Sequence, residues 1–250
     1  PGVLREVGRL RRLVETQRPD ILHARSRLPA WVARLALRGM RGPRPRWLTT
    51  VHGLNSPGRY SAVLTSGERV ICVSTVVRDY LLEHYPALPR ERLRVIPRGI
   101  DPAQFPHGHQ PDAAWREAFA REYPQLRGLP LLTLPGRGTR LKGHADGVRL
   151  LALLATRYGV QAALFMPGAR ETGREAYLAE IEALARSLGV GARVVACAPR
   201  ADVRDIYAAS ALVLQLSHQP EAFGRTALEA LSVGVPVLGF ELASTFAEIE

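Results

Sequence analysis

Short apolar runs and longer amphipathic stretches alternate along most of this chain. In residues 2–17, apolar side chains recur at the three- and four-residue spacing of an α-helix, with Arg and Glu between them. Residues 47–51 instead form a continuous β-branched and apolar run, which is the pattern of a buried strand. Because short runs of this kind alternate with helical stretches, the sequence predicts βαβ units and parallel sheets.

The pattern also gives the order of the expected elements. Strands are expected over residues 19–23, 47–51, 70–74, 93–97, 131–134, 161–166, 193–196, 211–216 and 235–240. Helices are expected over residues 2–17, 31–37, 75–84, 144–157, 174–188, 202–208 and 225–233. Ser74 stands where it would cap the helix that follows it.

One segment interrupts the alternation. Residues 102–128 are rich in Pro, Gly and His before a short helical piece, a composition typical of a linker. We therefore expect an N-terminal Rossmann-like domain over residues 1–108, a linker over 109–128 and a second Rossmann-like domain over 129–250. Ligands in such folds bind at the carboxyl ends of the strands.

The composition is that of an ordinary globular protein, with 250 residues, 46% of them hydrophobic and 23% charged. The two cysteines, Cys72 and Cys197, have no metal-ligand spacing and lie in apolar runs. We expect two buried thiols, no disulfide and a reducing compartment. No stretch reaches the roughly 18–20 uninterrupted apolar residues of a membrane helix.

The charge is concentrated in the first part of the chain. Residues 1–100 hold 19 Arg against 7 Asp and Glu, whereas residues 101–250 hold 15 basic and 16 acidic residues. Such a field favours anionic partners, which include nucleic acid, acidic lipid and a phosphorylated acceptor. The alternative explanation is a general bias toward Arg in the composition, which would give the same excess of positive charge without any anionic partner.

Lys142 is the single lysine among 34 basic residues, and it lies in the glycine-rich segment 135–143, PGRGTRLKG. An ammonium is a compact point charge that does not replace a guanidinium freely where geometry is tight. The segment follows an expected strand. These features favour a phosphate-binding cation over a surface lysine retained by chance.

A second polar cluster follows the expected strand 211–216. Glu221 stands in the loop, Gly224 allows a tight turn, and a helix is expected from Arg225. The amino terminus of such a helix presents free N–H groups and a partial positive charge to an anion. Glu229 lies about one turn into that helix.

Taken together, these segments resemble the retaining nucleotide-sugar glycosyltransferases of family 4, which have the two-domain GT-B fold. The matching segments are PDILHA at 19–24, TVHG at 50–53, VS at 73–74, VIPRGID at 95–101 with Phe105, GR at 136–137 with KG at 142–143, and Glu221 with Glu229 in an E-x7-E spacing. The resemblance covers essentially the whole chain.

The resemblance implies roles for particular residues. Arg137 and Lys142 would stabilise the diphosphate leaving group, Glu229 would hold the ribose hydroxyls, and Glu221 would bind hydroxyls of the donor sugar. His52 would lie near the transferred sugar. The expected residues are, for catalysis, His52, Arg137, Lys142 and Glu221; for donor binding, Gly136, Phe223, Gly224, Arg225, Thr226 and Glu229; and for an anionic acceptor, His23, Ser26 and Arg27. No D-x-D-like cluster is present, so we expect neither a metal nor another cofactor.

The chain also departs from the family pattern. Ser244 and Thr245 stand where the family usually has a Gly-Gly pair, and Arg98 stands where many members have Asn. The usual first strand with its glycine-rich loop would precede Pro1, and the last helices of the second domain would follow Glu250. We therefore expect each domain to be incomplete and the chain to be part of a longer transferase.

The resemblance implies transfer of a sugar from a UDP- or GDP-sugar to a hydroxyl acceptor, with retention, in lipopolysaccharide or other envelope glycan synthesis. A lipid-linked or saccharide acceptor is expected, in the cytoplasm or at the anionic inner face of its membrane. The alternatives are another GT-B sugar enzyme, such as a phosphorylase or epimerase, an inactive fragment and an anionic-ligand binding module. Nucleic acid is not an expected partner, because the Arg residues lack interleaved aromatics.

Overall fold

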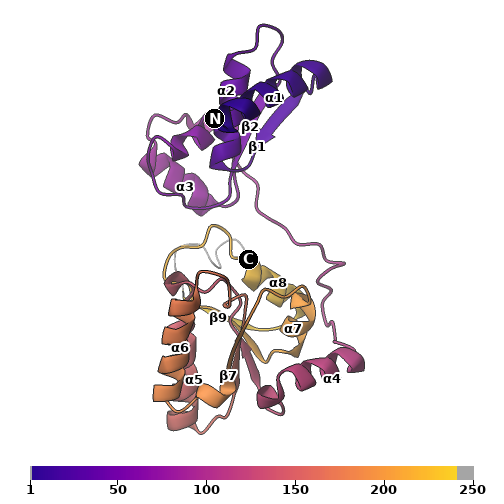
Figure 1. Cartoon of the computed structure of the whole chain (residues 1–250), viewed down its shortest axis with the longest axis vertical. Helices are drawn as coiled ribbons and strands as arrows, with labels where there is room; N and C mark the ends of the chain where they lie inside the picture. Colours follow the sequence, from indigo (N-terminus) through magenta and orange to yellow (C-terminus); the bar gives the residue numbers. More distant parts are fainter. Residues whose placement is uncertain (1, 241–250) are drawn as a thin grey trace. The chain divides into compact units, whose positions relative to one another are not determined.

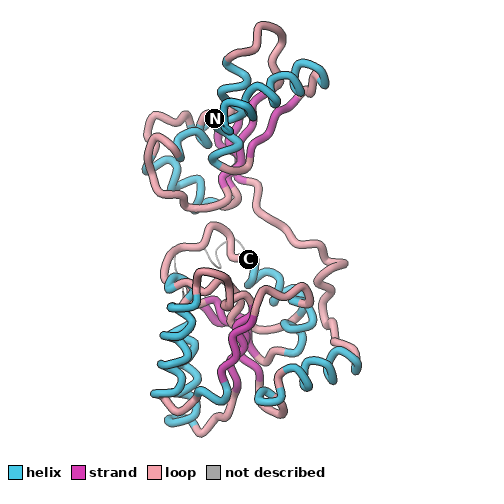
Figure 2. The backbone as a smooth tube through the Cα atoms, in the orientation of Figure 1, coloured by secondary structure: helices cyan, strands magenta, loops and turns pink. Residues whose placement is uncertain are grey.

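The computed structural model describes residues 2–240 and divides the chain into two compact units. Residues 2–98 and 221–223 belong to the first unit, and residues 99–220 and 224–240 belong to the second. Each unit contains one parallel sheet with helices packed on it (Figures 1 and 2).

The first unit contains a four-stranded sheet in the order β1-β2-β3-β4, with every pair parallel. Its elements are α1 (Gly2–Gln17), β1 (Ile21–Ala24), α2 (Arg27–Arg38), β2 (Arg46–Val51), η1 (Ser61–Thr65), β3 (Arg69–Cys72), α3 (Thr75–His84), η2 (Arg90–Arg92) and β4 (Leu93–Val95). In the β1–β2 register, His23 faces Leu48. The carboxyl ends of β1 and β2 therefore lie side by side.

Local sequence explains these helices. The buried face of α2 consists of Ala30, Ala33, Ala36 and Leu37, whose three- to four-residue spacing places them on one side of the helix. The predicted cap of α3 is confirmed, because the Ser74 side chain accepts a hydrogen bond from the Val77 backbone N–H at 3.1 Å. The buried face of α2 and the beginning of α3 are thus set by residues nearby in sequence.

The second unit contains a five-stranded parallel sheet in the order β7-β6-β5-β8-β9. Its elements are α4 (Ala113–Glu122), η3 (Pro124–Leu126), β5 (Leu131–Thr133), η4 (Arg140–Lys142), α5 (His144–Tyr158), β6 (Ala163–Pro167), α6 (Glu175–Ser187), η5 (Gly191–Arg193), β7 (Val194–Cys197), α7 (Val203–Ala209), β8 (Leu212–Gln215), α8 (Arg225–Val233) and β9 (Val237–Gly239). The chain first builds outward from β5 to β7 and then returns to the other side of β5. The strand order therefore reverses between β5 and β8.

Strand β6 is buried on both faces, which explains its continuous apolar sequence. Leu164 and Met166 pack in the core that includes residues of α5 and α6. Ala163 and Phe165 point the opposite way, into a cluster that includes Tyr123. The two-residue period of a strand thus divides one apolar run between two layers of helices.

Part of the range expected as a linker is a helix. In α4, Trp115 and Phe119 stack with ring centroids 4.9 Å apart, and Phe119 meets Phe165 of β6 edge-on at 5.2 Å. The indole N–H of Trp115 also donates to Asp202 at 2.7 Å. Aromatic residues at a four-residue spacing attach this segment to the second sheet.

The predicted strands and helices are confirmed, with boundaries that differ by a few residues; the largest shift is at α2, which begins at Arg27 and not at residue 31. Cys72 is buried, Cys197 is half-buried, and both are free thiols. Among the described residues, no helix combines the length and the apolar character needed to span a bilayer.

Candidate donor site and acceptor-side edge

The strand reversal between β5 and β8 brings together the two loops that the sequence singled out. β5 and β8 pair directly, with Leu132 opposite Leu212. After them, the His218 backbone N–H donates to the Leu141 carbonyl at 2.9 Å, and the His218 Nε2 forms a hydrogen bond with an Asp146 carboxylate oxygen. A point where strand order reverses is the usual ligand site of an open α/β sheet.

Glycine is required where these loops touch. Gly143 has φ of 71° and precedes α5. A Cβ at this position would lie 2.7 Å from the Leu216 Cβ and still closer to the Leu216 carbonyl oxygen. The loop 136–143 can therefore pack against the end of β8 only with glycine at this position.

The same loop carries the two predicted diphosphate cations. The aliphatic stem of Lys142 lies over Gly136, where an added Cβ would be 3.3 Å from the Lys142 Cδ. Arg137 is exposed in the same loop, and its carbonyl accepts a hydrogen bond from the Thr139 N–H at 2.7 Å. Gly136, Arg137 and Lys142 thus belong to one compact loop at the strand reversal.

His144 follows this loop and is a buried residue that the sequence analysis did not select. Its side chain is 1% exposed, and its ring meets Tyr177 edge-on with centroids 5.9 Å apart. Burial lowers the pKa of His144 to about 4. The imidazole is therefore neutral at neutral pH, beneath a loop that bears cations.

Helix α8 carries the other predicted donor residues. Gly224 precedes it in the left-handed region, with φ of 77°. Within the helix, the Arg225 guanidinium donates to the Glu229 Oε1 at 2.6 Å. The Tyr207 hydroxyl lies 3.5 Å from the other Glu229 oxygen, and burial, together with the Glu229 charge, raises the pKa of Tyr207. Glu229 is thus a buried carboxylate with a partner at each oxygen.

A cavity of about 730 Å³ opens onto this carboxylate. It is lined by Ala103, Gln104, Phe105, Ala201, Asp202, Val203, Arg204, Asp205, Arg225, Thr226 and Glu229. Among the predicted donor residues, Arg225, Thr226 and Glu229 line it. Gly136, Arg137 and Lys142 do not line it and lie in the loop 136–143, while Glu221 and Phe223 stand in the segment between β8 and α8.

In the first unit, the carboxyl ends of β1 and β2 bring two histidines and an arginine together. His23 Nε2 lies 2.6 Å from the Thr50 hydroxyl, and the Arg25 Nε–H donates to His52 Nε2 at 3.0 Å. A neutral His52 therefore carries its proton on Nδ1, an atom that is buried and has no hydrogen-bond partner among the described residues.

The electrostatics of this edge favour neutral histidines. Burial and then the Arg98, Arg25 and His23 charges lower the pKa of His52. Burial and then Arg25 lower the pKa of His23. Both imidazoles are thus predominantly uncharged at neutral pH, whereas the arginines around them keep the edge positive.

The remaining predicted acceptor residues are arranged differently. Ser26 is the N-cap residue of α2, where its side chain makes no capping hydrogen bond within the described residues. Arg27 points to the ring of Tyr60, 5.2 Å from its guanidinium carbon, and to the Ser61 hydroxyl at 3.5 Å. Arg27 therefore contacts η1, whereas Arg25 contacts His52.

Four residues near these sites were missed by the sequence analysis. Arg25 stands two positions after His23. Because side chains two positions apart on an extended chain point the same way, this spacing could have placed Arg25 at the same edge. His144 directly follows the KG pair, and Tyr207 lies in the apolar pattern of an expected helix. His218, between β8 and Glu221, gave no signal of its own, because its partner Asp146 is distant in sequence.

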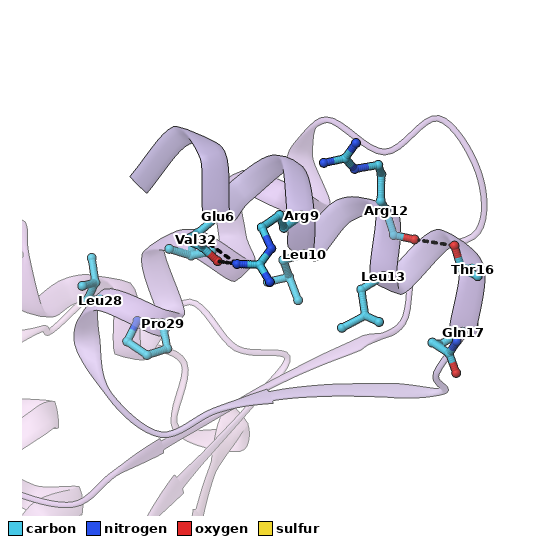
Figure 3. Close-up of a pocket in the computed structure, with 10 residues that line it drawn as sticks. All are labelled: Glu6, Arg9, Leu10, Arg12, Leu13, Thr16, Gln17, Leu28, Pro29 and Val32. Atoms are coloured by element: carbon cyan, nitrogen blue, oxygen red, sulfur yellow. Dashed lines mark hydrogen bonds and ion pairs between the residues drawn. The ribbon is translucent and has the colours of Figure 1, made fainter. Parts of the chain in front are cut away.

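A separate cavity of about 690 Å³ lies along α1 and α2 in the first unit (Figure 3). Leucines of both helices line it, and the Arg9 guanidinium donates to Glu6 at its rim. None of the predicted site residues contributes to it. Among the described residues there is also no group of three or more His, Cys, Asp or Glu side chains arranged to hold a metal ion. Ser244 and Thr245 lie outside the described residues.

Two family models match the chain. The model described as Glycosyltransferase Family 4 matches residues 1–104, and the model described as Glycosyl transferases group 1 matches residues 116–250. The boundary between the two matches falls within residues 105–115.

Curated relatives agree with these matches. D-inositol 3-phosphate glycosyltransferase of Corynebacterium kroppenstedtii is 31% identical over 183 residues, which cover 70% of this chain and 39% of that protein. Lipopolysaccharide glucosyltransferase WaaG of Escherichia coli is 31% identical over 156 residues, which cover 62% of this chain and 39% of that protein. The chain thus spans about two fifths of the length of these relatives.

Solved structures show the same fold. A glycosyltransferase from Rickettsia africae superposes with a TM-score of 0.82 at 24% identity, covering 99% of this chain and 64% of that one. Anabaena Alr3699/HepE in complex with UDP-glucose gives a TM-score of 0.80 at 19% identity, covering 98% of this chain and 65% of that one. With more than half of its residues matched by the group 1 model, and with the GT-B fold, this chain belongs to the glycosyl transferases of group 1, family 4 type.

Proposed function

We propose that this chain binds a nucleoside diphosphate sugar in its second unit and is part of an enzyme that transfers the sugar, with retention, to a hydroxyl acceptor. The transferred sugar is of the hexose type, and catalysis needs no metal. The product belongs to lipopolysaccharide or another envelope glycan, a proposal supported by the name of the relative WaaG.

The observation that carries the proposal is that the second unit holds Arg137 and Lys142 together in the loop at the strand reversal, and a cavity along α8 that contains the Glu229 carboxylate. A nucleoside diphosphate gains negative charge as the glycosidic bond breaks. Fixed cations and a helix amino terminus at that position stabilise the charge. This arrangement provides for the leaving group the stabilisation that a divalent metal gives in other transferases.

The nucleoside fits the cavity beside α8. A volume of about 730 Å³ is within the usual range for small-ligand sites. The two oxygens of Glu229 suit the vicinal hydroxyls of ribose, since a carboxylate accepts two hydrogen bonds side by side. Glu221, Phe223, Gly224 and Thr226 then border the diphosphate and the donor sugar.

The first unit supplies the acceptor side. His52 has a lowered pKa, so its proposed role near the transferred sugar is that of a neutral imidazole. His23, Ser26 and Arg27, together with Arg25, form a basic edge suited to an anionic acceptor. UDP-glucose and UDP complexes of HepE support a UDP-sugar as the first donor to test, and a GDP-sugar is the second.

The basic first unit also suits an anionic surface. We propose a cytoplasmic protein that binds peripherally to the inner face of the membrane, where lipid-linked acceptors are found. Co-sedimentation with anionic liposomes at low salt tests this point, since an electrostatic attachment is lost as ionic strength rises. A chain that ignores such liposomes at low salt contradicts the membrane location.

Calorimetric titration of UDP, GDP and ADP into the folded chain tests the donor site. Replacing Lys142 by Ala removes a charge-assisted contact, so we expect the affinity for the favoured nucleotide to fall by about ten- to a hundredfold. Arg140→Ala is the control, because Arg140 lies in the same loop but pairs with Glu180 at 2.7 Å. Equal affinities for the wild-type chain and Lys142→Ala would refute the assignment.

Two further measurements address the remaining parts of the proposal. Titration in excess EDTA should leave nucleotide affinity unchanged if no metal is needed. In the longer parent enzyme, the anomeric configuration of the product, read by NMR, tests retention. A product of inverted anomeric configuration contradicts retention, and nucleotide binding that EDTA weakens contradicts metal independence.

A further inference from the structure

The cavity beside α8 contains an ion pair that competes with the proposed ligand. Arg225 and Glu229 are paired at 2.6 Å, and their side chains are 52% and 11% exposed, respectively. Both residues line the cavity. The carboxylate oxygen that a ribose hydroxyl would use is therefore already occupied by the guanidinium.

The position of Arg225 makes this pairing conditional. Arg225 is the first residue of α8, where the partial positive charge of the helix amino terminus disfavours a cation. The first turn of α8 contains no acidic residue, and the carboxylate that offsets the guanidinium is that of Glu229, one turn further on. An anion arriving at the amino terminus would compensate both the helix end and Arg225.

Guanidinium chemistry allows the exchange. The planar fork of Arg binds carboxylate and phosphate with similar geometry, and the half-exposed Arg225 side chain has room to turn about its stem. Glu229 is mostly buried and lies beside the Tyr207 hydroxyl, so it has less room to move than Arg225. Release of Arg225 leaves Glu229 able to accept hydrogen bonds from two hydroxyls.

We propose that Arg225 is a specificity-determining residue that exchanges its ion pair with Glu229 for the diphosphate of the donor, so that the site opens to the ribose only when the phosphates are present. The inference rests on the proposed function and adds a mechanism to it. A nucleoside alone must break the ion pair without compensation, whereas a nucleoside diphosphate supplies a new partner. Phosphate binding and ribose binding are thereby coupled, and the coupling is reciprocal.

Two variants separate the two halves of the exchange. Arg225→Ala removes the competitor, so uridine affinity should rise by about threefold or more while UDP affinity falls at least about tenfold. Glu229→Gln frees the guanidinium, so pyrophosphate affinity should rise by about threefold or more while uridine affinity falls. UDP and pyrophosphate are followed by calorimetry and uridine by ligand-observed NMR. GDP with guanosine, or ADP with adenosine, replace the uracil pair if the wild-type chain prefers them.

Exchange predicts that each variant raises the affinity for one probe and lowers the affinity for another, whereas loss of a structural role would lower all affinities. Arg121→Ala is the matched control, because Arg121 forms an i,i+4 pair with Glu117 on the surface of α4; it should change none of the affinities. If each variant lowers the affinities for all probes alike, or changes none, the exchange is refuted although the donor site stands. If no nucleoside diphosphate binds the folded wild-type chain, the proposed function fails and the exchange fails with it.

Discussion

His144 makes the stability of the second unit depend on pH in a way that can be measured. Burial lowers its pKa from 6.5 to about 4 in the folded chain, whereas the unfolded chain keeps the ordinary value. The unfolded state therefore binds the proton more tightly, so stability falls as pH drops through 6.5 and stops falling near 4. Linkage gives a loss of about 2 kcal/mol between about pH 7 and 5, and about 3 kcal/mol by about pH 4.

The assay is amide hydrogen exchange by mass spectrometry, read on β5 and β6, which reports opening of the second unit alone. Wild type is compared with His144→Gln at several values between about pH 4 and 7, after correction for the intrinsic exchange rate. The variant lacks the titrating group. The opening free energy of the wild type, minus that of the variant, should therefore fall by about 2–3 kcal/mol between about pH 7 and 4. His107→Gln is the control, because His107 is an exposed histidine of the same unit.

Parallel pH profiles for the wild type and His144→Gln would refute the reasoning. They would mean that His144 keeps an ordinary pKa in the folded chain, either because water reaches the ring or because its nitrogens have partners that stabilise the charged form. An NMR titration of the His144 ring would then show protonation near pH 6.5.

Three other outcomes are expected. Gly143→Ala should destabilise the second unit by about 2 kcal/mol or more, because the new Cβ would overlap Leu216 in a left-handed turn; unchanged protection of β8 would contradict this. Ser74→Ala should cost about 1 kcal/mol through loss of the α3 cap, measured by urea unfolding of the first unit, with Thr16→Ala as an exposed control in the same unit. The pKa of Cys72 is raised to about 12 by burial, so iodoacetamide should label it at pH 8 only after unfolding; rapid labelling of Cys72 itself in the native chain, read by peptide mapping, would contradict the burial.

Several features of the fold could be predicted because they depend on local pattern. The apolar run over residues 161–166 indicated the strand β6, and Ser74 marked the start of α3. The βαβ alternation then required parallel sheets, in which strand ends share one edge. This is why the loop 136–143 and the segment before α8 were expected at one site, although about eighty residues separate them.

Other features depend on contacts that no local pattern encodes. The attachment of α4 to the second sheet needs the Phe119 ring to meet Phe165, and the beginning of α2 was placed four residues late because Arg27–Ala30 contains a proline within its first turn. The contact of Arg25 with His52 joins two strand ends through side-chain conformation. Sequence reasoning favoured Arg27 at this edge, whereas the structure directs Arg27 to Tyr60.

The sequence by itself determined the fold class, the order of the strands and helices, and the loops that carry the candidate chemistry, because hydrophobic period and glycine position act over a few residues. Tertiary structure alone decided which of those side chains are buried and which are paired. The burial of His144 beneath its loop, and the cavity that surrounds the local Arg225–Glu229 pair of α8, arise from packing between distant segments. Burial and pairing set charge state and ligand access, so the details of the candidate site follow from the folded chain.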